Sequence, residues 1–293
     1  AILFCDNNHK TFGVFLKSKS AQKIQLRFGG FLMKRLLSIF LAAICVIVLI
    51  AGQIHWKGKT AIPNKQEKAK EGKISETRDI AEEQRFEALL SFAANWPEEA
   101  STAFAQKLRK EEPYKIVFAG SEALGEGADS WPEIVAERMA RTYGDVFDFA
   151  FLSYDLTSTE FVEQNKVQDL IKEEADLILL EPFTLNDNGR VVIETSLENI
   201  ERIIDAVLDA KQDTVFLLQP PQPIYNASWY LFQLENLQRF AEQSGIPYLN
   251  HWEAWPDTKD PAINQYLTND RSAPNEEGHK LWAEFLIDYF IAN

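Results

Sequence analysis

Apolar and polar positions alternate regularly over the C-terminal two thirds of the chain. Short apolar runs are separated by longer segments in which apolar residues recur at helical spacing. The runs predict strands over residues 116–119, 147–152, 175–180, 214–218 and 246–249. Helices are predicted over residues 132–142, 159–173, 194–211, 227–243 and 276–291. This alternation predicts a three-layer α/β/α domain over residues 113–293, with a parallel sheet of about five strands.

A different pattern precedes this domain. Residues 36–54 form an almost unbroken apolar run of the length that spans a bilayer as a helix, and Lys34 and Arg35 precede it. The run predicts a transmembrane signal anchor over residues 33–55, and a cleaved signal peptide is the alternative. Residues 56–112 predict a charged linker followed by two helices, which form either a stalk or a layer packed on the domain.

The charge distribution predicts how the chain is oriented in the membrane, and it excludes one class of partner. Residues 1–60 carry a net charge of +8, which leaves −22 for the remainder of a chain whose net charge is −14. Basic residues before the anchor predict a cytoplasmic N-terminus and an extracellular domain. So acidic a domain argues against nucleic acid as a partner. Because Met33 opens a normal export segment, residues 1–32 are predicted to be non-native upstream translation, with a basic cytoplasmic tail as the alternative.

Polar residues occur where the predicted strands end. The carboxyl ends of parallel strands meet at one edge of a sheet, where α/β proteins place their sites. Ser121 directly follows the first apolar run and opens a turn that contains Gly125 and Gly127. A simple turn serine is the alternative. The residues at or just after the five strand ends are Ser121, Asp155, Asn186, Gln219 and His251.

Three short segments resemble the motif blocks of a known family. They are Ala119-Gly120-Ser121 with Gly125, Thr184-Leu185-Asn186-Asp187, and Asp270 followed by Ala273-Pro274-Asn275. In order and spacing they are similar to the blocks of the SGNH (GDSL-type) hydrolases: Gly-Asp-Ser-x-x-x-Gly, Gly-x-Asn-Asp and Asp-x-x-His-Pro-Asn. The resemblance covers about residues 113–293. It implies the flavodoxin-like SGNH hydrolase fold and a serine ester hydrolase.

The resemblance also implies roles for single residues. Ser121 would be the nucleophile and Asp270 the carboxylate that orients the base, as acyl transfer by a serine requires. The oxyanion donors would be the N–H of Ser121, a backbone N–H at Leu152 and the amide of Asn186. The glycine of the family's second block is missing near Leu152.

The base is the missing part of this arrangement. Ala273 stands where the family carries its catalytic histidine. His251, at a predicted strand end, is the candidate substitute base, and a structural histidine beside Trp252 is the alternative. His279 occupies a position that favours capping or packing. A serine without a base predicts weak hydrolysis.

Two functions follow from these residues. The first is a membrane-anchored extracellular serine esterase that acts on a small-molecule or carbohydrate ester, such as an acylated sugar of the cell envelope. The second is a catalytically inactive carbohydrate- or ligand-binding module, in which aromatic residues stack on sugar. No His/Cys/Asp group has metal-ligand spacing and no glycine-rich nucleotide motif is complete, so neither a metal nor a cofactor is expected. The aromatic residues assigned to stacking are Trp131, Tyr154, Trp229, Trp252 and Trp255.

Overall fold

The computed structural model describes residues 65–292, with side chains from Arg78 onward. The chain divides into two compact units between Glu76 and Thr77, and the unit that begins at Thr77 is the one described here. The predicted anchor over residues 33–55 and the upstream residues 1–32 lie outside the described part. Within the described part, none of the helices combines the length and apolar character that a membrane crossing needs.

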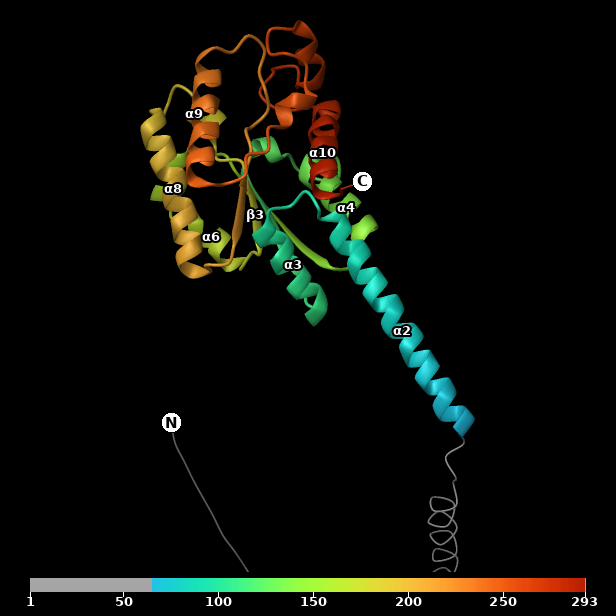
Figure 1. Cartoon of the computed structure of the whole chain (residues 1–293). Helices are drawn as coiled ribbons and strands as arrows, with labels where there is room; N and C mark the ends of the chain where they lie inside the picture. Colours follow the sequence, from blue (N-terminus) through green and yellow to red (C-terminus); the bar gives the residue numbers. More distant parts are fainter. Residues whose placement is uncertain (1–64, 293) are drawn as a thin grey trace, which may run out of the picture. The chain divides into compact units, whose positions relative to one another are not determined.

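A parallel sheet forms the centre of the unit (Figure 1). Its strand order is β2-β1-β3-β4, and β1 pairs with β2 along its whole length, from Tyr114 opposite Phe147 to Ser121 opposite Tyr154. The predicted three-layer α/β fold with a parallel sheet is confirmed, with four strands in place of about five. The strands are β1 (Tyr114–Ser121), β2 (Phe147–Tyr154), β3 (Leu177–Leu180) and β4 (Val215–Leu218).

The fifth predicted strand, residues 246–249, is reduced to a single parallel bridge between Leu218 and Tyr248. Pro247 supplies its carbonyl oxygen to the N–H of Leu218, and Leu249 donates its N–H to the carbonyl of Leu218. Proline has no N–H to donate, so the ladder cannot continue through this segment.

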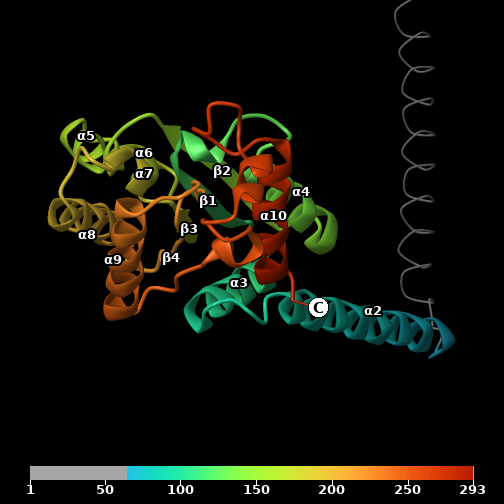
Figure 2. The same cartoon turned by 90° about the horizontal axis from the view of Figure 1, so that it is seen from above.

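Helices cover both faces of the sheet (Figure 2). On one face, α4 and α10 pack against alternate strand residues such as Ile116 and Phe118. On the other, α5, α6, α8 and α9 cover the remaining residues, such as Val117 and Ala119. Alternate side chains of a strand point to opposite faces, so each strand contributes to both cores. The bounds are α4 (Trp131–Tyr143), α5 (Ser158–Glu163), α6 (Val167–Lys172), α7 (Thr184–Asp187), α8 (Ile193–Ala210), α9 (Trp229–Ser244) and α10 (Glu276–Phe290), with 3₁₀ turns η1 (Glu122–Leu124), η2 (His251–Ala254) and η3 (Pro261–Tyr266).

The helix predicted over residues 159–173 is interrupted. It forms α5 and α6 because Asn165, between them, has a left-handed backbone with φ of 57°. Asparagine tolerates this conformation better than most residues, and a helix cannot continue through it.

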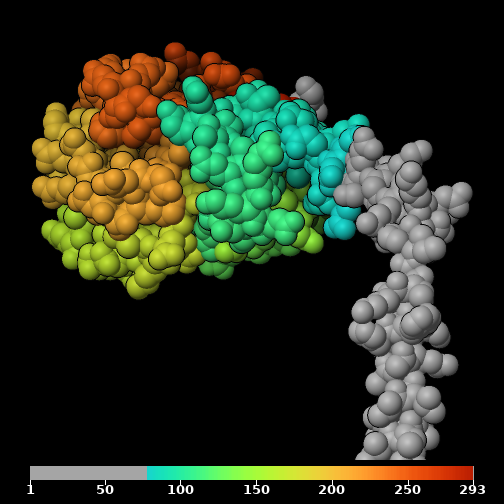
Figure 3. Space-filling model, turned by 60° about the horizontal axis from the view of Figure 1, so that its bottom comes forward, coloured from blue at the N-terminus to red at the C-terminus, as the bar shows by residue number. Residues whose placement is uncertain are grey.

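Two helices precede the first strand, and from Thr77 onward they belong to the same unit. They are α2 (Lys65–Phe92) and α3 (Glu98–Lys110), and residues 65–77, predicted as a linker, are helical. Trp96 and Phe104 are buried and pack on each other with ring centroids 5.2 Å apart. From Leu89 onward these residues therefore pack on the domain, whereas residues 78–88 of α2 are exposed apart from the half-buried Phe86. The compact unit begins at Thr77. Figure 3 shows the face of the unit that carries α3, in blue-green.

Candidate functional site

The sheet has a switch point between β1 and β3. From β1 the chain moves to the neighbouring edge strand β2, then crosses to β3 on the other side of β1. In open α/β sheets this reversal opens a crevice at the carboxyl ends of the two strands, where ligands bind. Ser121 is the last residue of β1, and Glu181 directly follows β3. The switch point therefore places these two residues together.

Ser121 connects the strand to the turn that follows. Its hydroxyl accepts a hydrogen bond from the N–H of Ala123 at 3.2 Å and caps η1. Its carbonyl oxygen accepts from the hydroxyl of Ser153 on β2 at 3.1 Å. Only 2% of Ser121 is exposed. The serine is thus buried beneath the turn that follows it, at the carboxyl end of β1.

Glu181 is a candidate site residue that sequence reasoning missed. Its carboxylate Oε2 accepts the backbone N–H of Ser121 at 2.8 Å, which is the N–H assigned to the oxyanion. Its second oxygen, Oε1, is buried without a hydrogen-bond partner among the described residues. The available signal was a charged residue placed directly after a wholly apolar strand, Leu177–Leu180.

Close approach of β1 and β3 brings Glu181 to Ser121. A Cβ added at Gly120 would lie 2.7 Å from both the Cβ and the carbonyl oxygen of Glu181. Real Cβ atoms do not come so close, so only glycine fits at position 120 without a shift of the strands. Gly120 therefore allows Ser121 to lie close to the carboxyl of Glu181.

Burial controls the charge of Glu181. The pKa of its carboxyl is raised from 4.5 to about 7, mainly by the loss of hydration on burial and to a smaller extent by the nearby Asp187. The hydroxyl and N–H of Ser121 and the N–H of Phe183 oppose this rise. None of the groups that shift this pKa is a cation. A carboxyl of this kind changes its charge near neutral pH.

Further polar atoms remain without partners near the carboxyl ends of β3 and β4. Each lies on a residue at most 2% exposed, and none has a hydrogen-bond partner among the described residues. Buried polar groups are normally satisfied by protein, water or ligand. This edge of the sheet can therefore form further hydrogen bonds, as donor through Gln219 and as acceptor through the oxygens. The atoms are Thr184 Oγ1, Gln219 Nε2, Gln222 Oε1 and Gln233 Oε1.

Asn186 lies on the short helix α7. Its side-chain amide donates to the carbonyl oxygen of Leu156 at 3.0 Å, not to a group of Ser121. The next residue, Asp187, is buried and accepts the N–H of Ser158 at 2.8 Å and the hydroxyl of Ser196 at 2.6 Å. Asp187 thereby fixes α7, and Asn186 with it, to α5 and α8.

Leu152 lies inside β2, two residues before the strand ends. It stands opposite Ala119, whereas Tyr154 stands opposite Ser121. The contact from β2 to the serine is made by Ser153 through its hydroxyl. The structure thus places the predicted oxyanion residue of the second block within the paired strand.

Asp270 and Ala273 lie in a loop before α10. Asp270 is exposed, and its Oδ1 accepts from the hydroxyl of Thr268 at 2.6 Å and that of Ser272 at 2.9 Å. These bonds lower the pKa of the Asp270 carboxyl. The amide of Gln222 donates to the carbonyl of Ser272 at 2.8 Å and ties the loop to the segment after β4. The loop therefore lies beside the carboxyl edge of the sheet, while the Asp270 side chain bonds within its own loop.

His251 is fully buried. Its Nε2 is 2.9 Å from the carbonyl of Pro220, its Nδ1 accepts from Trp255 Nε1 at 3.0 Å, and its ring stacks on Trp282. Burial lowers the pKa of His251 to about 3, with weaker opposition from the carbonyls of Pro220 and Pro221. With both nitrogens engaged, the structural alternative, and not the substitute base, describes this residue.

His279 is half-buried in the first turns of α10. Its Nδ1 accepts the N–H of Trp131 at 3.3 Å, and its Cε1 would lie 2.6 Å from a Cβ added at Gly125. Burial lowers its pKa, against the effect of Asp129. His279 thus packs the loop after Ser121 onto α10, in agreement with a packing role.

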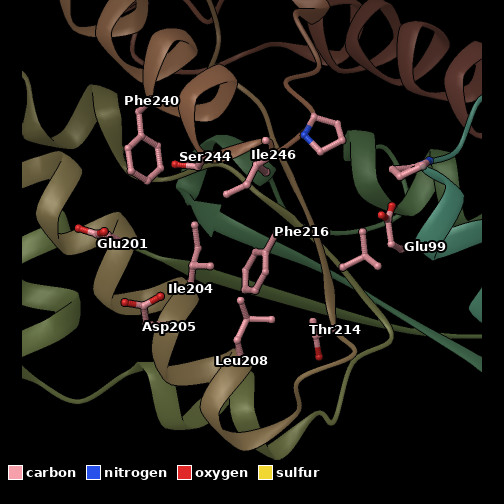
Figure 4. A pocket seen from close by; sticks show the side chains of 14 residues that line it. Glu99, Glu201, Ile204, Asp205, Leu208, Thr214, Phe216, Phe240, Ser244 and Ile246 are labelled. Atoms are coloured by element: carbon pink, nitrogen blue, oxygen red, sulfur yellow. The ribbon is translucent and has the colours of Figure 1, made fainter.

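The described surface includes hollows beside the loop after Ser121 and along β4. One, of about 330 Å³, is lined by Gly125, Gly127 and other residues of the loop after Ser121, and by Phe151 and Ser153 of β2. The other, of about 460 Å³, lies along β4 between α8 and α9, and Phe216, Ile204 and Phe240 line it (Figure 4). No residue of the predicted site lines either hollow.

Comparison with known proteins gives a likeness of structure alone. The sequence matches no family model and no curated protein. A lipolytic protein of the G-D-S-L family from Desulfitobacterium hafniense is similar over 60% of this chain and 98% of its own, with 17% identity and a TM-score of 0.50. A GDSL-like lipase from Parabacteroides merdae covers 60% and 95% at 12% identity, also with a TM-score of 0.50. A catalytic mutant of an acetylxylan esterase from Geobacillus stearothermophilus covers 60% and 94% at 11% identity, with the same TM-score. The chain therefore has the SGNH/GDSL hydrolase fold.

Proposed function

We propose that this chain is an acyl-ester hydrolase of the SGNH type, with Ser121 as its nucleophile and a small-molecule or carbohydrate ester as its substrate. The observation that carries the proposal is the position of Ser121 at the end of β1, at the switch point, against the buried carboxyl of Glu181. Parallel α/β sheets bind their ligands at this point. A nucleophilic serine also needs a proton-accepting group beside it.

The proposal includes a membrane anchor over residues 33–55 and an extracellular domain. The apolar run of residues 36–54 and the basic residues before it support this placement. An enzyme in this location has the acylated carbohydrates of the cell envelope within reach, and the fold is shared with an acetylxylan esterase. This supports an acylated sugar as the substrate class.

The low exposure of Ser121 favours a second candidate function. At 2% exposure, and without a contact to an imidazole among the described residues, the serine also fits an inactive ligand-binding module. The aromatic side chains assigned to sugar stacking divide into two groups. Trp131 and Trp255 are buried in the core, whereas Trp229 is 60% exposed. A sugar platform would therefore need Trp229 and the half-buried Tyr154 and Trp252.

Hydrolysis of p-nitrophenyl acetate by the full-length chain tests the proposed function. We expect Ser121→Ala to lower the rate at least about a hundredfold, because the acyl group then has no acceptor. Ser130→Ala is the matched control, since Ser130 is also 2% exposed and its hydroxyl caps no helix. Equal rates for the wild-type and Ser121→Ala proteins would contradict the proposal and favour the binding module.

A further inference from the structure

We propose that the carboxylate of Glu181 is the general base for Ser121, a role that rests on the proposed function of this serine. In this role Glu181 accepts the proton that Ala273, in place of a histidine, cannot accept. Among the described residues, Glu181 is the ionisable side chain that bonds Ser121, with Oε2 at 2.8 Å from its N–H. The Ser121 hydroxyl also lowers the pKa of this carboxyl, against the effect of burial.

The two oxygens of Glu181 have different environments. Oε2 holds the N–H of Ser121, and Oε1 is buried without a partner among the described residues. An unpartnered buried oxygen loses its hydration without compensation. A proton on the carboxyl removes this penalty, because the carboxyl is then neutral. The geometry therefore favours proton transfer to the carboxyl over retention of its charge.

The reaction balances with Glu181 as the only proton carrier. As Ser121 Oγ bonds to the carbonyl carbon of the ester, its proton passes to Glu181 and the carbonyl electron pair moves to oxygen. When the pair returns, the C–O bond to the alcohol breaks and Glu181 protonates the leaving oxygen. A water molecule then gives its proton to Glu181 and attacks the acyl-serine. Glu181 returns this proton to Oγ, and a carboxylic acid leaves.

Proton transfer also frees an oxyanion donor. While Glu181 is charged, its Oε2 occupies the N–H of Ser121. Once the carboxyl is neutral, this charge-assisted bond weakens, because bonds to ionised acceptors are the stronger ones. The negative charge by then lies on the substrate oxygen, which can take the N–H in its place. Charge thus moves from the carboxyl to the substrate without a net charge being added to the buried site.

The groups around Glu181 keep its charge change near neutral pH. Asp187, on α7, raises its pKa, and the N–H of Phe183 lowers it. From α9, Tyr230 faces Glu181, but its own pKa lies well above the ordinary value and its hydroxyl donates to Gln222, so it stays neutral. With its pKa at about 7, Glu181 is partly ionised at neutral pH, as a general base should be.

The rate at which an alkyl fluorophosphonate probe labels Ser121 in the full-length chain tests the inference. Glu181→Gln keeps an acceptor for the N–H of Ser121 but cannot take a proton, and we expect labelling at least about a hundredfold slower. Asp176→Asn is the matched control. It alters a buried carboxyl at the other end of β3, which accepts the N–H of Lys115 at 2.8 Å, and should leave the rate close to wild type. An unchanged rate for Glu181→Gln would overturn the inference.

Ala273→His separates failure of this inference from failure of the proposed function. If Glu181 is the base, a histidine at position 273 should change the labelling rate little. A gain of about a hundredfold or more would show that Ser121 is a nucleophile without a base, which overturns the role of Glu181 alone. No labelling of Ser121 in the wild-type or Ala273→His protein would overturn the proposed function as well.

A measurement on the wild-type protein covers the case in which Glu181→Gln does not fold. Labelling should accelerate as pH rises through about 7, where Glu181 loses its proton. Ionisation of a carboxyl absorbs little heat, so this midpoint should stay fixed between two temperatures. Ionisation of an imidazole absorbs much more, and a midpoint that falls on warming would assign the base to a histidine.

Discussion

The two ends of β3 carry the same local arrangement with different electrostatics. At the amino end, Asp176 accepts the N–H of Lys115 at 2.8 Å, and at the carboxyl end Glu181 accepts the N–H of Ser121 at 2.8 Å. Both carboxyls are buried, and both bond a residue of β1. Asp176, however, lies 3.0 Å from Nζ of Lys211 and 3.5 Å from that of Lys107. Glu181 has no such cation among the groups that shift its pKa.

The comparison shows that burial alone does not define a site. Two lysines compensate the charge at Asp176, which makes that end of the strand a structural ion pair. The charge at Glu181 is uncompensated, which costs stability but leaves the carboxyl ready to take a proton. Uncompensated buried carboxyls occur at functional sites more than elsewhere. This difference therefore favours Glu181, at the carboxyl edge of the sheet, over Asp176 as the carboxyl of a functional site.

The largest expected effect is on the pH dependence of stability. Burial raises the pKa of Glu181 from 4.5 to about 7, so the folded protein binds a proton that the unfolded chain has lost in this window. The stability that this group contributes is present below pH 4.5 and disappears as pH rises through about 7. Glu181→Gln should therefore gain about 3 kcal/mol relative to wild type between about pH 5 and pH 8.

Urea unfolding of both proteins at the two pH values measures this gain. The difference between variant and wild type matters, since it cancels the contribution of every other titrating group. A constant difference across the window would mean that Glu181 keeps an ordinary pKa, and the contrast between the two ends of β3 would be lost.

A smaller effect is expected at the other end of the strand. Asp176→Asn keeps an acceptor for the N–H of Lys115 but leaves Lys211 and Lys107 without their buried partner. We expect a loss of about 2 kcal/mol, typical for a hydrogen bond to a charged group, with ester hydrolysis retained. Thermal unfolding and the p-nitrophenyl acetate assay measure the two properties. A loss of activity in a stably folded Asp176→Asn protein would contradict a purely structural role for this end.

Much of the fold follows from local patterns in the sequence. Residues of β1 and β3 alternate between the two cores, Leu177 and Leu179 facing one and Ile178 and Leu180 the other. Such apolar runs between amphipathic helices predict the layers without knowledge of strand order. Ser121 could be singled out because a serine directly after a buried strand lies at the sheet edge. Pro247 could have indicated that the last predicted strand would not form a ladder.

The site could be predicted only in part, because its key contact is not local. Glu181 and Ser121 meet through the pairing of β1 with β3, which are separated by about sixty residues, and no motif records this pairing. The turn of Asp270 onto Thr268 and Ser272 depends on the loop conformation, in which Arg271 adopts a φ of 62°. The burial of His251 under Trp282 likewise requires α10 to be in place.

Titration of the Glu181 carboxyl carbon by ¹³C NMR tests the central claim most directly. The full-length chain would carry ¹³C at the glutamate side-chain carboxyls, and the signal absent from Glu181→Gln would assign the residue. The account predicts a midpoint of about 7, with the carboxyl protonated in much of the protein at neutral pH. A midpoint near the ordinary value of 4.5 would contradict it, since Glu181 would then be a structural carboxylate without a role in proton transfer.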